Sequence, residues 1–90
     1  MPLYLYQAAY TPESLAAQIK NPANRLEVVA EQISSTGVRL VTGGFSLGEH
    51  DIAIVMEAPD DTTMAAVSVA IAAGGAVRNA RTTRLLRPHT

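Results

Sequence analysis

The sequence predicts an α+β domain whose elements follow one another in the order βαββαβ. Three observations predict it. Leu3–Tyr10 and Asp51–Glu57 are apolar at both even and odd positions, as in central strands of a sheet covered on both faces. Apolar residues at helical spacing precede and follow a central pair of strands that reverses at residues 47–50. Residues 76–87 form a last, polar strand, so we expect one antiparallel sheet with its helices.

Length and composition indicate a single domain, residues 1–90, because a 90-residue chain is too short for two cores. The chain is 48% hydrophobic and 17% charged, a globular profile, and it has no apolar run long enough for a membrane helix. It starts without the pattern of an export signal and contains no cysteine. We therefore expect a cytoplasmic protein without a membrane partner.

The first half of the chain predicts a strand and an interrupted helix. Leu3–Tyr10 is the strand, and Thr11 is expected to cap a helix that starts at Pro12. Asn21-Pro22 interrupts this helix, which should resume near Ala23 or Asn24 and end at Gly37 in a left-handed conformation. The apolar positions of the resumed helix form its expected buried stripe: Leu26, Val29, Ala30 and Ile33.

The second half predicts a hairpin, a helix and an edge strand. Val38–Leu47 contains Gly43-Gly44, which we interpret as a bulge or a close backbone approach, because no helix follows to make a phosphate loop. After Asp51–Glu57, Asp60 or Asp61 should cap a helix over residues 62–73. Its expected stripe is Met64, Val67 and Ile71, and Gly74-Gly75 should end it.

Right-handed crossovers turn this order into a ferredoxin-like sheet with strand order 4-1-3-2 and both helices on one face. The other face would then be uncovered, although strands one and three are apolar on both sides. A monomer would expose Tyr4, Tyr6 or their counterparts on the alternate positions, which monomers rarely tolerate. We therefore expect the partner to be a second copy of the chain, in a homodimer or a larger homo-oligomer.

The central hairpin resembles the GYD domain family of small bacterial proteins, through residues 47–52 and 55–61, and the likeness extends over nearly the whole chain. Gly48 and Asp51 match the glycine and aspartate of the family motif, whereas His50 stands in the place of its tyrosine. The resemblance implies a ferredoxin-like fold of the dimeric α/β-barrel type. It implies no activity and no cofactor.

The strand order also predicts a candidate site. Tyr10, His50, Asp51 and Arg78 should gather at one end of the sheet, near the helix start at Thr11. There, His50 could act as a catalytic base while Tyr10, Asp51 and Arg78 bind a carboxylate or an enolate. The alternative is that Asp51 caps the turn, His50 is solvated and Arg78 guards an edge strand against mispairing. No ligand spacing for a metal is present, since the chain has two histidines and no cysteine.

The charge distribution argues against nucleic acid as a partner. All eight acidic residues precede residue 78, and four spaced arginines follow, at positions 78, 81, 84 and 87. This density is too low for phosphate-backbone binding. Glu57 ends the third strand, either in solvent or facing a pocket on the open side.

The leading functional hypothesis is a homo-oligomer that binds a small organic anion. A cofactor-independent isomerase or monooxygenase and a ligand-sensing regulatory domain stay open as alternatives, because the fold alone does not choose between them.

Overall fold

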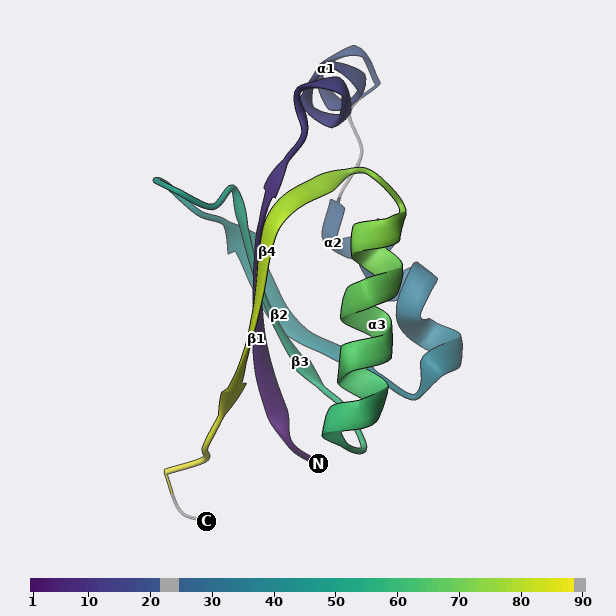
Figure 1. Ribbon diagram of the computed structural model, residues 1–90, viewed down its shortest axis with the longest axis vertical. Helices are drawn as coiled ribbons and strands as arrows, with labels where there is room; N and C mark the ends of the chain where they lie inside the picture. The colour runs from purple at the N-terminus through teal and green to yellow at the C-terminus, as the bar shows by residue number, and fades with distance from the viewer. Residues whose placement is uncertain (22–24, 89–90) are drawn as a thin grey trace.

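The computed structural model describes residues 1–21 and 25–88, and it shows a four-stranded sheet with helices (Figure 1). The elements in chain order are β1 (Leu3–Tyr10), α1 (Pro12–Lys20), α2 (Arg25–Ile33), a single 3-10 turn (Ser34–Thr36), β2 (Arg39–Phe45), β3 (Ile52–Glu57), α3 (Asp61–Ala73) and β4 (Val77–Leu85). All pairings are antiparallel and the order is β2-β3-β1-β4. The predicted α+β class and the predicted 4-1-3-2 order are thereby confirmed. Within the described residues, no helix has the length and apolar character needed to cross a membrane.

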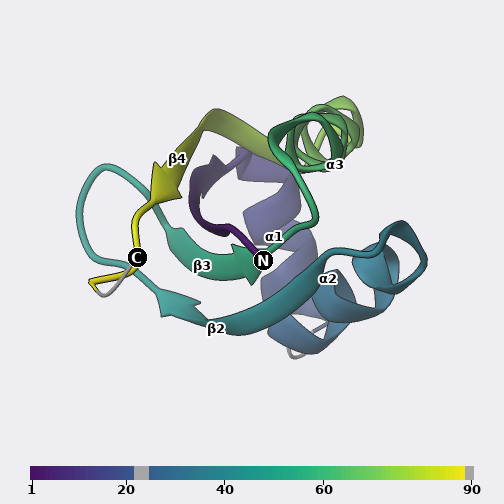
Figure 2. The same cartoon turned by 90° about the horizontal axis from the view of Figure 1, so that it is seen from below.

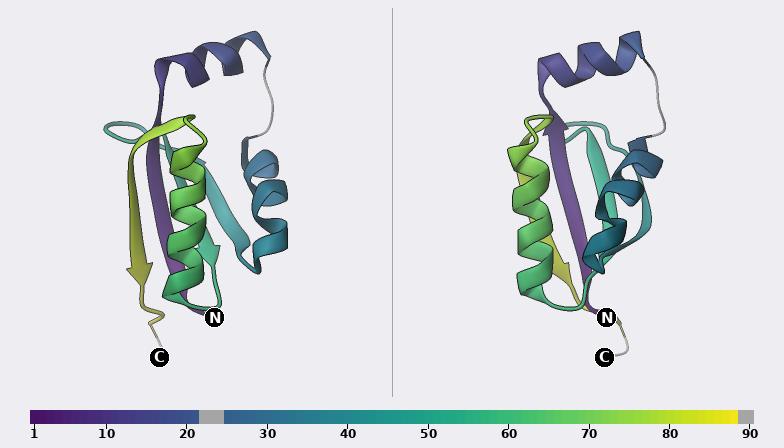
Figure 3. Two further views of the ribbon diagram at one scale, coloured as in Figure 1. Left: turned by 45° about the vertical axis from the view of Figure 1, so that its right-hand side comes forward. Right: turned by 90° about the vertical axis from the view of Figure 1, so that its right-hand side faces the viewer.

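Helices α2 and α3 cover one face of the sheet, and no helix of the described chain covers the other (Figures 1 and 2). Helix α3 packs beside β4, and α2 packs beside β2 at the opposite edge. Helix α1 lies beyond the end of the strands instead of on the sheet (Figure 3). It ends at Lys20, and its C-cap Asn21 has a backbone conformation (φ −138°, ψ 76°) that is neither helical nor regularly extended. The predicted restart at Ala23 or Asn24 and the side chain of Leu26 lie outside the described residues.

The predicted caps are present and fix where the helices begin. The Thr11 hydroxyl accepts a hydrogen bond from the Ser14 amide at 3.2 Å, and the Asp60 carboxylate accepts one from the Thr63 amide at 2.7 Å. This hydrogen bond holds the pKa of Asp60 below its usual value. Gly37 adopts a positive φ of 86°, as the predicted helix end requires. The local chemistry of the chain therefore places its helix boundaries.

The core lies between the sheet and the pair α2 and α3. Strands β1 and β3 contribute alternate residues to it, and both helices and the segment before β2 supply the rest: Tyr4, Tyr6, Ala8, Tyr10, Ile52, Ile54, Met56, Met64, Val67, Ile33 and Val38. Tyr4 and Tyr6 are 3% and 1% exposed, so they face the helices of their own chain. Of the two alternatives that the sequence left open, it is the counterparts of the tyrosines, Leu3 and Leu5, that lie on the uncovered face.

Two bulges interrupt the regular pairing. On β2 the extra residue is Val41, between Leu40 and Thr42, whereas Gly43 and Gly44 pair regularly with β3. The sequence predicted a bulge or a close backbone approach at Gly43-Gly44, and the bulge lies two residues earlier, at Val41. On β4 one extra residue lies between Arg78 and Arg81, where Asn79 has a positive φ of 52°.

Candidate functional site

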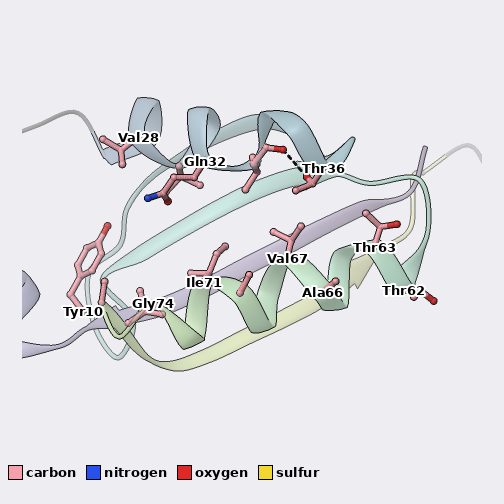
Figure 4. Close-up of a pocket in the computed structure, with 15 residues that line it drawn as sticks. Tyr10, Val28, Gln32, Thr36, Thr62, Thr63, Ala66, Val67, Ile71 and Gly74 are labelled. Atoms are coloured by element: carbon pink, nitrogen blue, oxygen red, sulfur yellow. Dashed lines mark hydrogen bonds between the residues drawn. The ribbon is translucent and has the colours of Figure 1, made fainter.

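A cleft of about 700 Å³ lies between α2 and α3 on the helix side of the sheet (Figure 4). We call it the helix cleft. Its apolar lining comes from both helices and from the start of β4: Val28, Val29, Ile33, Ala66, Val67, Ala70, Ile71, Ala76 and Val77. Ile33 and Val67 are buried at its base, and Ala66 and Ala70 are exposed along α3. The short alanine side chains leave space beside the buried stripe of α3.

Polar side chains lie toward the two ends of the helix cleft. Tyr10 and Gln32 lie in one half, and Thr62 and Thr63 lie at the opposite end, with the apolar Val67 between them (Figure 4). Tyr10 is 6% exposed, so its ring forms part of the wall. Thr36 donates a hydrogen bond to the Ile33 carbonyl at 2.6 Å and accepts one from the Val38 amide at 3.2 Å. A mostly apolar lining with a small number of polar groups is typical of a site for a small molecule.

The end of the sheet brings three of the four predicted site residues into one hydrogen-bonded region. The Tyr10 amide donates to the Asp51 carboxylate at 2.8 Å, and the Asp51 amide donates to the Ala8 carbonyl at 2.9 Å. One ring nitrogen of His50 lies 3.1 Å from the Asn79 carbonyl oxygen, at the β4 bulge. These contacts join the β2–β3 turn to the neighbouring strands.

Arg78 and the ring of Tyr10 lie on opposite faces of the sheet. Tyr10 pairs with Val77, which lines the helix cleft, and the next pair is Ala9 with Arg78. Among the four predicted site residues, Tyr10 contributes its ring to the wall of the helix cleft. Proton transfer by His50 and anion binding by Asp51 and Arg78 stay predictions.

A polar cluster that the sequence did not reveal lies on the outer side of α3. The Tyr4 hydroxyl donates to the Asp61 carboxylate at 2.5 Å, and an Arg84 guanidinium nitrogen lies 3.5 Å from the other carboxylate oxygen. The hydrogen bond to Asp61 is the main cause that raises the pKa of Tyr4. With Ser68 and Thr82, whose hydroxyls are 2.9 Å apart, this cluster borders a second cleft of about 420 Å³. Tyr4 and Arg84 are direct partners across β1 and β4, so a correct pairing register of these strands would have predicted that the two side chains lie close together.

The face of the sheet that no helix of the described chain covers, the open face, has an aliphatic centre. Its residues alternate with those that face the helices, and they come from all four strands: Leu3, Leu5, Gln7, Ala9, Arg39, Thr42, Gly44, Ala53, Val55, Glu57, Arg78, Arg81, Thr83 and Leu85. Leu5 pairs with Val55 on one side and with Thr83 on the other. A Cβ atom added at Gly44 would meet nothing within 4 Å, so there is open space beside this part of the face.

Glu57 lies at the rim of the open face, between two arginines. Its carboxylate forms ion pairs with Arg39 and, at 2.8 Å, with Arg87, and its side chain is 13% exposed. Neither of the two environments expected for this residue, open solvent or a pocket, describes it. The hydrogen bond from Arg39 is the main cause that lowers the pKa of Glu57.

This lowered pKa predicts a pH-dependent contribution to stability. Because the folded state favours the ionised carboxylate, the contribution is complete above the ordinary pKa of 4.5 and is lost as the pH falls through the lower folded pKa. We expect Glu57→Gln to lower Tm at pH 7, and we expect the gap to the parent chain to narrow near pH 3. Thermal unfolding followed by circular dichroism at both pH values measures this gap. An equal difference in Tm at both pH values would contradict a stabilising contribution from the ionised Glu57 carboxylate.

Tyr6 is a buried phenol whose hydroxyl has no hydrogen-bond partner among the described residues. Burial raises its pKa. Removing a buried, unsatisfied hydroxyl relieves a desolvation penalty, so Tyr6→Phe should stabilise the fold by about 1 kcal/mol. Tyr4→Phe, the same change on the same strand, should destabilise it, because the bond to Asp61 is lost. Urea unfolding of both variants tests this, and a loss of stability in Tyr6→Phe would refute it.

Comparison with known proteins identifies the family of the chain, a relative and a fold neighbour. A family model described as the GYD domain matches residues 4–90. A protein of Thermus thermophilus named "Glutamine synthetase and cystathionine beta-lyase binding protein" is 32% identical over 78 residues, which are 87% of this chain and 82% of that protein. The crystal structure of MtbAldR matches with a TM-score of 0.69 at 15% identity, over 99% of this chain and 54% of that one. The chain thus spans about half the length of MtbAldR, and the likeness shows the fold alone.

Proposed function

Because the chain belongs to the GYD domain family, we propose that it is a binding protein that forms a homodimer through the open face and binds an enzyme of metabolism. The observation that carries the homodimer is the aliphatic centre of the open face, which no helix of the described chain covers. Leu3, Leu5, Val55 and Leu85 are only partly buried in one chain. A second copy placed sheet to sheet would remove them from water.

The sheet surface of the open face is too small to form a stable dimer interface by itself. Four strands at 4.8 Å spacing and six residues at 3.3 Å give a flat area of roughly 400 Å². A stable interface buries about 800 Å² on each partner, so the sheet alone falls short. Phe45, Leu47 and Leu86 lie at or just beyond the ends of β2 and β4 and are 75%, 102% and 83% exposed. The loop between β2 and β3 curves to the side of the open face (Figure 1), so we expect it to contact the partner copy.

The second part of the proposal is enzyme binding, supported by the name of the Thermus thermophilus relative. In a sheet-to-sheet dimer, α2 and α3 of both copies face outward, so each dimer presents two equal surfaces. Such a dimer could bind two enzyme subunits at once and gain avidity.

Sedimentation velocity tests enzyme binding with purified proteins. A fluorescently labelled chain is mixed with glutamine synthetase or with cystathionine beta-lyase from its own organism. We expect the label to sediment with at least one of these enzymes, and an unlabelled excess of the chain to displace it. If the label sediments alone in both mixtures, the enzyme-binding part of the proposal fails, while the homodimer is judged separately by the mass of the chain alone.

A further inference from the structure

The helix cleft has the dimensions of a small-molecule site. Its volume of about 700 Å³ falls within the range of roughly 300 to 1,000 Å³ that ligand pockets occupy. Its base is formed by side chains already buried in the core, Ile33 and Val67, and its ends are fixed by the Asp60 cap of α3 and by the pairing of Tyr10 with Val77. The cleft is therefore formed before any ligand binds.

The lining of the helix cleft selects against charged ligands. Among the residues that the structure describes, none of the 15 that line the cleft is an aspartate, glutamate, lysine, arginine or histidine. A carboxylate or an ammonium group entering it would lose water without gaining a partner of opposite charge. An uncharged molecule meets no such penalty. The cleft therefore differs from the predicted anion site at the end of the sheet, where His50 and Arg78 lie.

The distribution of polar groups constrains the ligand further. The middle of the cleft is aliphatic, with Val67 and Ile71 projecting from α3 toward α2 (Figure 4). Gln32 lies toward one end, and Thr62 and Thr63 lie at the other (Figure 4). We propose that the helix cleft binds an elongated, uncharged small molecule with an aliphatic body and a hydrogen-bonding group at one or both ends. This site goes beyond the proposed function, since it requires neither the dimer nor an enzyme partner.

The proposal is tested on the full chain with two probes of equal length, 1-octanol and octanoate. Both are titrated into methyl-labelled protein and followed by NMR. Octanol should shift the methyl resonances of Val28, Val67 and Ile71. Octanoate should bind at least about tenfold more weakly, because its charge is unpaired in the cleft.

Two matched variants locate the binding. Ala66→Phe fills the cleft from α3, and Ala72→Phe puts the same side chain on an exposed position of the same helix outside it. We expect Ala66→Phe to weaken octanol binding at least about tenfold and Ala72→Phe to leave it unchanged, with both variants folded by circular dichroism.

Three results would overturn the proposal. The first is equal binding of octanol and octanoate. The second is a set of shifts confined to open-face methyl groups such as those of Leu5 and Val55. The third is that neither probe shifts any methyl resonance, while the Ala66→Phe substitution itself shifts the resonances of Leu15 and Ile19. That result would show that the exposed apolar side of α1 from another copy occupies the cleft.

Discussion

Replacing Leu5 with aspartate is expected to convert the homodimer into folded monomers. Leu5 lies at the centre of the open face, between Val55 on β3 and Thr83 on β4. In the proposed dimer the new carboxylate would be buried without a partner, once from each copy. An uncompensated buried charge costs about 3 kcal/mol or more, so the dissociation constant should rise at least about 100-fold. In a lone chain the same carboxylate faces water, so folding should be little affected.

Sedimentation equilibrium measures the change, with Val69→Asp as the matched control. Val69 is an apolar residue on α3 that is 68% exposed and lies on the helix side of the sheet. Its replacement introduces the same charge away from the open face, so it should leave the dimer intact. A Leu5→Asp variant that keeps the mass of the parent assembly would contradict the proposed interface.

The second large effect is expected in the core, where Ile54→Ala should destabilise the fold by about 2 to 5 kcal/mol. Ile54 is 2% exposed on the central strand β3 and pairs with Tyr6 on β1 and Gly43 on β2. The cost combines lost burial with a cavity that the surrounding strand cannot close. Because a domain of this size has a total stability of about 5 to 15 kcal/mol, the variant should be close to unfolding.

Urea unfolding at a fixed protein concentration measures this loss. Val69→Ala is the control, since an exposed substitution should change stability by no more than about 0.5 kcal/mol. If Ile54→Ala unfolded at the same urea concentration as Val69→Ala, then β3 would not be central to the core.

The sequence predicted the elements well because their signals are local. The caps at Thr11 and Asp60 are set by side chains within three residues of the amides they accept from. The strand order followed from the handedness of two crossovers, which the helix positions determine. A resemblance at residues 47–52 and 55–61 predicted the family that the family model confirms over residues 4–90.

The parts that the sequence did not predict depend on contacts between distant residues. The two-residue alternation of a strand shows that β1 has apolar residues on both faces. It does not show whether Tyr4 and Tyr6 or Leu3 and Leu5 face the helices. The ion pairs of Glu57 reach Arg39 and Arg87, which are 18 and 30 residues away. The helix cleft depends on the separation of α2 and α3, which no local pattern encodes.

The candidate site was predictable in position but not in orientation. The strand order correctly brings Tyr10 and Asp51 to one end of the sheet, where the Tyr10 amide binds the Asp51 carboxylate. The β4 bulge at Asn79 supplies the carbonyl that His50 contacts, and a bulge of this kind was not expected in the edge strand. Alternation then places Arg78 on the face opposite to the ring of Tyr10.

The most direct measurement of the central claim, that a second copy covers the open face, is an isotope-filtered NMR experiment on mixed dimers of labelled and unlabelled chains. The account predicts intermolecular nuclear Overhauser effects from the methyl groups of Leu3, Leu5, Val55 and Leu85. Val67 and Ile71, on the helix side, should show none. Intermolecular effects that arise only from the helix side, or a mass equal to the 9.5 kDa of one chain, would contradict it.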